Sequence, residues 1–182
     1  MTPASTLEYA LLGLLRQQAR SGYDLRKMFA TTPMGHFSDS PGSIYPALRR
    51  LAARGWIAPS AKGGDPRKRQ VFTVTRAGTH AVIDWLRQPV TREDIIRRVD
   101  ELHLRFAFLD GNVERPVTVR FLEDLERELT AYVRELKAHA KIFPPEVRSS
   151  TGYLVFTLGV AGYQQQLAWA RRVRKQFTEA LS

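Results

Sequence analysis

The chain has 182 residues with 28 Lys and Arg against 18 Asp and Glu, a formal net charge of +10 and a pI of about 10.4. With 43% apolar and 25% charged residues, it has the composition of a packed globular protein of one domain or two small ones. Because it has no cysteine, a disulfide scaffold, a thiolate zinc site, an iron–sulfur cluster and a cysteine nucleophile are excluded. We expect a cytoplasmic protein, since the sequence shows neither a secretory signal nor an apolar run long enough to span a bilayer.

The positive charge lies mainly in the first half of the chain. Residues 1–90 hold 13 Lys and Arg against 5 Asp and Glu, a charge of +8, whereas residues 91–182 hold 15 against 13, a charge of +2. A basic surface attracts nucleic acid or another polyanion. The first half is therefore expected to meet such a partner, and the mixed charges of the second half indicate helices that pack on one another.

Two capping signals open the chain. Ser5 with Glu8 forms a capping-box pattern at the start of a first helix, which carries regularly spaced leucines on one face. Ser21 with Asp24 repeats the pattern for a second, short helix that should end near residues 32–33.

A third helix and a hairpin are expected next. Prolines in the segment 41–46 are compatible only with a first helical turn, and Gly55 is a natural helix stop. Residues 56–58 and 70–74 have strand composition and flank the basic, turn-rich loop 62–69, so they predict a two-stranded hairpin. A fourth helix follows.

The second half is predicted to be helical throughout. The fourth helix of the first half should be capped by Thr75 and end before Pro89, which places a domain boundary between residues 1–88 and 89–182. One helix is expected over 91–109, a long one from Pro116 with leucines spaced as in a coiled-coil seam, and a last one from about 150 to 181.

The order helix, helix, helix, strand, basic loop, strand is typical of a winged helix-turn-helix, in which the third helix enters the DNA major groove and the loop, or wing, lies along the backbone. At 100° per residue, the third helix separates an apolar side from a side that carries Tyr45, Pro46, Arg49 and Arg50. Arginine can bind guanine edges or phosphates, so an outer face of this kind suits a groove. A merely solvated basic face is the alternative.

These segments resemble the ordered motifs of PadR-type transcriptional regulators. The resemblance covers about residues 7–87, including Gly42-Ser43-Ile44-Tyr45-Pro46 and Phe72-Thr73-Val74-Thr75-Arg76-Ala77-Gly78, and the later helices look like the longer PadR subfamily with a three-helix tail. It implies a mainly α fold with a small β-hairpin: an N-terminal winged helix-turn-helix and a C-terminal helical dimerisation domain. It also implies a non-enzymatic dimeric repressor without a cofactor, bound to a palindromic double-stranded operator and released by a small molecule.

Candidate site residues fall into two sets. Those expected at DNA combine the third helix, the start of the second helix and the wing: Ser43, Tyr45, Pro46, Arg49, Arg50, Tyr23, Lys62, Arg67, Lys68 and Arg69. Either Arg49 or Arg50 could read bases. An aromatic-rich set that could wall a pocket for an aromatic or drug-like effector consists of Trp85, Tyr163 and Trp169.

Other functions have weaker support. The isolated histidines lack a third convergent ligand, so no metal site is expected. No phosphate-binding glycine loop or catalytic motif is recognised, so no enzyme is expected. Two alternatives stay open: a protein-interaction module on a winged-helix scaffold, and a constitutive nonspecific DNA binder.

Overall fold

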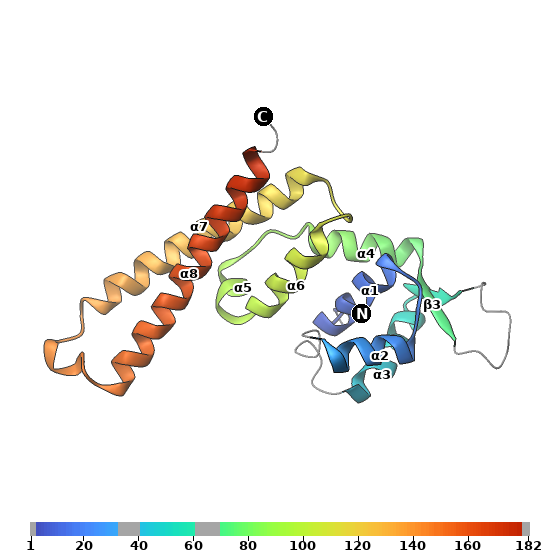
Figure 1. Cartoon of the computed structure of the whole chain (residues 1–182), viewed down its shortest axis with the longest axis horizontal. Helices are drawn as coiled ribbons and strands as arrows, with labels where there is room; N and C mark the ends of the chain where they lie inside the picture. The colour runs from blue at the N-terminus through green and yellow to red at the C-terminus, as the bar shows by residue number, and fades with distance from the viewer. Residues whose placement is uncertain (1–2, 33–40, 61–69, 180–182) are drawn as a thin grey trace. The chain divides into compact units, whose positions relative to one another are not determined.

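The computed structural model describes residues 3–32, 41–60 and 70–179. The chain divides into two compact units, residues 1–86 and 87–182. Figure 1 shows helices α1 to α4 and the strands in the first unit and helices α5 to α8 in the second.

Both N-terminal helices begin at the predicted capping boxes. In α1 (Thr6–Gln17) the Ser5 hydroxyl accepts the Glu8 amide, and the Ser5 amide donates to the Glu8 carboxylate at 2.7 Å. In α2 (Gly22–Thr31) Ser21 and Asp24 make the same reciprocal pair. These bonds satisfy backbone donors that lack helical partners and so fix where each helix starts.

The predicted third helix begins with a single 3₁₀ turn, η2 (Pro41–Ser43), and continues as α3 (Ile44–Ala53). The chain then turns at Gly55, whose φ of +68° is the left-handed conformation expected of a helix-stopping glycine. Helix α4 (Arg76–Leu86) starts after Thr75, whose hydroxyl accepts the Gly78 amide and donates to the Gly55 carbonyl.

The sheet has three strands, so the predicted two-stranded hairpin was incomplete. Strands β2 (Ile57–Pro59) and β3 (Val71–Val74) pair antiparallel as expected, with Ile57 opposite Val74. A third strand, β1 (Arg20–Ser21), pairs with the other edge of β3. With only two residues, β1 is too short to show the alternating pattern that identifies a strand in sequence.

The core of the first unit lies where α1, α3 and α4 meet. Leu11, Leu12 and Leu51 are fully buried there, and Trp85 is 2% exposed. The Trp85 ring stacks on Tyr9 with centroids 4.6 Å apart and planes only 3° from parallel. This packing holds α3 in place from its inner side and leaves its outer side to solvent.

The second unit opens with two helices where one was predicted. Helix α5 (Arg92–Arg97) and helix α6 (Val99–Leu109) are separated by Arg98, whose φ of −130° and ψ of +33° are not helical. Hydrogen bonds continue on both sides of the break, from the Arg98 amide to Asp94 and from the Leu102 amide to Arg98. The apolar spacing correctly predicted that Ile95, Leu102 and Leu109 are buried, but Ile96 is 39% exposed, and the spacing gave no sign of the break.

Helices α7 (Arg115–Ala140) and α8 (Thr151–Glu179) run side by side and are joined by a segment that contains the 3₁₀ turn η3 (Pro145–Val147), as Figure 1 shows. Leu122 and Leu129 are buried along the predicted seam of α7. No helix among the described residues is both long and apolar enough to cross a membrane.

Candidate nucleic-acid interface

Helix α3 presents one buried and one exposed side. Ile44, Leu48 and Leu51 are at most 3% exposed, whereas Tyr45 is 43% exposed and Arg49 lies on the same open side. The predicted division of this helix is therefore confirmed. A helix with aromatic and cationic groups on its exposed side has the shape and charge that suit a major groove.

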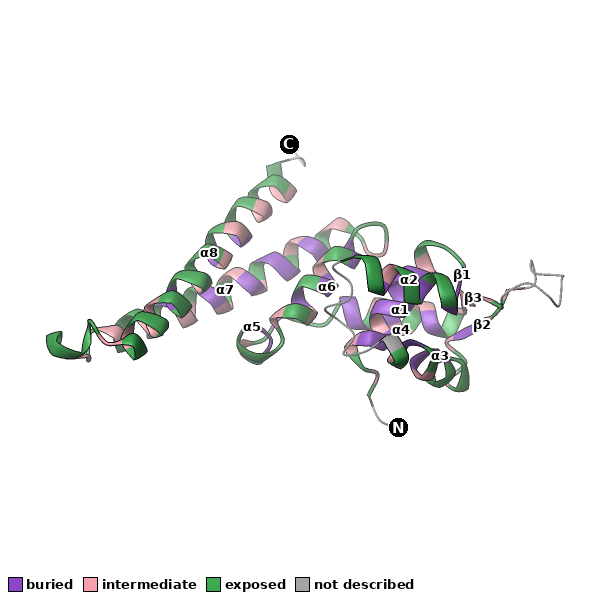
Figure 2. Ribbon diagram, turned by 60° about the horizontal axis from the view of Figure 1, so that its bottom comes forward, coloured by how far each residue is buried: buried purple, intermediate pink, exposed green. Residues whose placement is uncertain are grey.

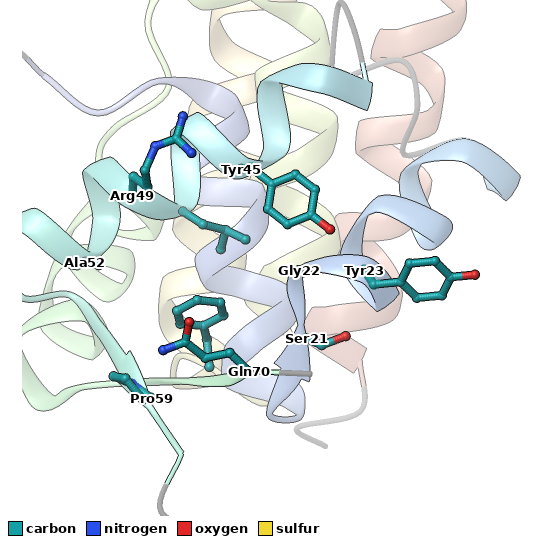
Figure 3. A pocket seen from close by; sticks show the side chains of 10 residues that line it. Ser21, Gly22, Tyr23, Tyr45, Arg49, Ala52, Pro59 and Gln70 are labelled. Carbon is teal, nitrogen blue, oxygen red and sulfur yellow. The ribbon is translucent and has the colours of Figure 1, made fainter. Parts of the chain in front are cut away.

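Beside this outer side lies an open cavity of about 560 Å³, lined by residues of α2, α3 and the sheet. Figure 3 shows the Tyr45 ring extending from α3 toward Gly22, while the Tyr23 ring points outward from the start of α2. Gly22 makes this arrangement possible, because a Cβ there would come within 2.8 Å of Tyr45 Cε1. Tyr23 is 45% exposed, similar to Tyr45, so both aromatic residues contribute to this surface.

The two neighbouring arginines of α3 differ in their surroundings. Arg49 lines the cavity, is exposed, and has no hydrogen bond or ion pair with any residue that the structure describes. Arg50 donates from Nε to Glu8 Oε1 at 2.9 Å, and its side chain is about half exposed.

Glu8 is a buried carboxylate, with only 2% of its surface exposed. Burial by itself would raise the pKa of this carboxyl, but the hydrogen bond from the Ser5 amide and the bond and charge of Arg50 outweigh it, and the pKa lies below its usual 4.5. Glu8 therefore stays ionised at neutral pH. It joins the first turn of α1 to the last turn of α3.

The remaining residues predicted to contact DNA occupy different positions. Ser43 ends the turn before α3 and its hydroxyl makes no capping bond to that helix, and Pro46 is half-buried in the first turn. The four wing residues, Lys62, Arg67, Lys68 and Arg69, lie outside the described residues.

Sequence reasoning did not single out part of the cavity wall. Gln70 and Phe72 line it from the sheet, and Ala52 and Pro59 complete it near the end of α3 and in β2. Gln70 is exposed and can both donate and accept hydrogen bonds. In the sequence, the available signal for Gln70 was its position between the basic loop and β3.

The three predicted effector residues lie in different surroundings. Trp85 is buried in the first unit against Tyr9, and Tyr163 packs edge-on to Tyr132 with centroids 4.8 Å apart. Trp169 lines a cavity of about 190 Å³ within the second unit, where its ring meets the Phe106 ring edge-on with centroids 5.1 Å apart.

That smaller cavity is lined by residues of α6, α7 and α8. Its wall is aromatic and aliphatic, with two polar side chains: Val99, Leu102, His103, Phe106, Phe121, Leu125, Gln166 and Trp169. Among the described residues, no group of three or more His, Cys, Asp or Glu could hold a metal ion.

Three helices followed by paired strands, with an exposed cationic and aromatic side on the third helix, define the first unit as a winged helix-turn-helix domain. Residues 11–83 match the family described as "Transcriptional regulator PadR-like family". The chain is also 25% identical over 174 residues to the Negative transcriptional regulator PadR of Bacillus subtilis, covering 92% of this chain and 94% of that one. The family match lies within the winged helix-turn-helix unit, the same part of the chain in which the motifs resemble PadR-type regulators.

Solved structures similar to this chain include two of Bacillus subtilis PadR. One is in complex with operator DNA, with 25% identity, a TM-score of 0.42, and coverage of 97% of this chain and 99% of that one. The other is in complex with p-coumaric acid, with 24% identity, a TM-score of 0.42, and 98% coverage of both chains.

Proposed function

We propose that this protein is a transcriptional regulator of the PadR type, a repressor that binds a palindromic DNA operator through α3 and the wing. The carrying observation is the exposed side of α3, where Tyr45 and Arg49 stand free of the core that holds the rest of the helix. The likeness to a negative regulator over most of the chain supports repression. The activity is binding rather than catalysis, and it takes place in the cytoplasm.

The direct test is fluorescence anisotropy with labelled DNA from upstream of the regulator's own gene, beside a scrambled duplex of equal composition, at two salt concentrations. We expect a preference for the native duplex that persists at the higher salt, since base contacts survive screening better than phosphate contacts. Arg49→Gln should weaken binding, whereas Arg97→Gln, which removes an exposed charge from α5, should not. Equal, salt-sensitive binding to both duplexes would contradict an operator-specific repressor.

We propose further that α8 pairs two copies of the chain. Leu154, Val155 and Leu158 are 55%, 67% and 72% exposed on this helix, and Figure 2 shows α8 mostly in the colours of exposed and intermediate residues. Large apolar side chains gathered on one segment favour association rather than exposure to water. Two copies related by a two-fold axis would present two recognition helices, about 34 Å apart, to successive major grooves.

The cavity of the second unit is proposed to receive the effector. An apolar cavity of about 150 Å³ holds benzene, so 190 Å³ has room for one aromatic ring with a short substituent, and His103 and Gln166 can bond to a polar group on it. We would titrate p-coumaric acid into the protein by calorimetry. Leu125→Phe, which fills the cavity, should abolish binding and the effect on DNA affinity. Leu136→Phe, on the same helix but outside the lining, is the control.

A further inference from the structure

We infer that Glu8 is a positioning residue for DNA recognition: it retains Arg50 as a clamp between α1 and α3 and leaves Arg49 as the arginine of α3 that contacts DNA. The inference rests on the proposed DNA-binding function. It assigns different roles to two adjacent residues that sequence reasoning could not tell apart.

The bonding of Glu8 divides its carboxylate between two elements. Oε2 accepts the Ser5 amide at 2.7 Å and so closes the cap of α1, while Oε1 accepts Arg50 Nε at 2.9 Å and holds the last turn of α3. Each oxygen therefore has a distinct partner. A shift of α3 along α1 would break the bond with Arg50.

Burial makes the clamp costly to open. Glu8 is 2% exposed, and a buried charge that loses its partner is strongly unfavourable. If Arg50 turned toward a phosphate and gave up Glu8, binding would have to offset that loss. Arg49 has no acidic partner among the described residues, so it can reach DNA without breaking an ion pair.

The charges of these residues also favour Arg49 over Arg50 as the arginine that contacts DNA. The ionised Glu8 carboxylate neutralises Arg50, and a neutral pair releases few counterions from DNA. Each phosphate neutralised by a protein cation adds about 0.9 to the slope of log K against log salt. The slope therefore counts the arginines that contact phosphate. Replacing an arginine whose role is purely structural would leave the slope unchanged.

The experiment measures this slope and the melting temperature for three single variants. Arg49→Gln should lower the slope by about 0.9 if it contacts phosphate, or remove the preference for the native duplex if it reads a base. Arg50→Gln should lower the melting temperature and leave the slope unchanged. Glu8→Gln, which keeps an oxygen for the Ser5 amide, should steepen the slope by about 0.9, because Arg50 is then free to neutralise a phosphate.

If Arg50→Gln proves too unstable to assay, the double variant Glu8→Gln with Arg50→Gln replaces it, because it leaves no buried charge unpaired. Its slope should equal that of the wild type. Two outcomes would overturn the inference while DNA binding by the wild type stands. One is a slope that falls in Arg50→Gln, or in the double variant, by as much as in Arg49→Gln. The other is an unchanged slope in Glu8→Gln. Absence of duplex binding by the wild type would overturn the proposed function and this inference together.

Discussion

At the scale of single residues, the acidic group that matters most to the first unit is Glu8. Its pKa is lowered in the folded state, despite the opposing effect of burial, by the Ser5 amide and Arg50. A carboxyl with a lowered pKa contributes stability above its unfolded pKa of about 4.5 and loses that contribution as pH falls through the lower, folded value. Acidification should thus loosen the contact between α1 and α3.

Glu8→Gln should lower the free energy of unfolding by about 1.5–3 kcal/mol at pH 7, the range for a hydrogen bond to a charged group. The difference from the wild type should shrink below about pH 4.5, because protonation removes the same interaction from the native protein. Urea unfolding at pH 7, 5 and 3.5 measures both values. A difference that stays constant across this range would show that the Glu8 charge does not stabilise the fold.

Gly22→Ala tests the placement of Tyr45. The new methyl group would lie 2.8 Å from Tyr45 Cε1 and 3.2 Å from Leu48 Cδ1, so the exposed Tyr45 ring should move away from α2. If its hydroxyl bonds to DNA, affinity should fall by about 0.5–1.5 kcal/mol, the net value of one hydrogen bond.

The matched control for Gly22→Ala is Gly152→Ala, where the added methyl group meets nothing within 4 Å. It should leave affinity unchanged and add at most about 1 kcal/mol of stability, since alanine favours a helix over glycine. If both variants bound DNA with the affinity of the wild type, Tyr45 would not contribute to DNA binding.

At the scale of elements, local chemistry determined what could be predicted. The helix starts at Ser5, Ser21 and Thr91 follow from side chains that bond their own backbone, so sequence alone located them. Strand β1 and the break at Arg98 depend on neighbours distant in sequence or on a single pair of dihedral angles, and neither leaves a periodic signal.

The same distinction applies to the candidate site: features set by local geometry could be predicted from the sequence, and contacts between distant residues could not. The outer side of α3 follows from helical geometry, so Tyr45 and Arg49 were placed correctly. The bond between Glu8 and Arg50 joins residues 42 positions apart, and no local pattern reports it. Trp85, Tyr163 and Trp169 share composition but belong to three different packing environments.

For α8, Leu158→Asp should convert the proposed dimer to a monomer, because it places a charge in the proposed apolar interface. Sedimentation velocity at micromolar concentration would show the change in mass. Gln165→Asp introduces the same charge at an exposed polar position of the same helix and should leave the dimer intact. A wild-type chain that sediments as a monomer would contradict the pairing itself.

At the scale of the whole molecule, the uneven charge predicts how binding responds to salt. The first half carries a charge of +8, and three adjacent cations of the wing contribute to it: Arg67, Lys68 and Arg69. Replacing all three with Gln should flatten the slope of log K against log salt by up to about 3. Anisotropy titrations from low to high salt measure this slope, and an unchanged slope would remove the wing from the interface.

The three tryptophans have a consequence for spectroscopy, because each lies in a different environment. Trp56 is half-buried with the Arg54 guanidinium 5.1 Å from its ring centroid, Trp85 is sealed against Tyr9, and Trp169 borders the small cavity of the second unit. Replacing two of them at a time with Phe would leave one emitter per protein. The protein thereby contains its own optical probes, one for the end of α3, one for the core of the winged-helix unit and one for the occupied or empty cavity.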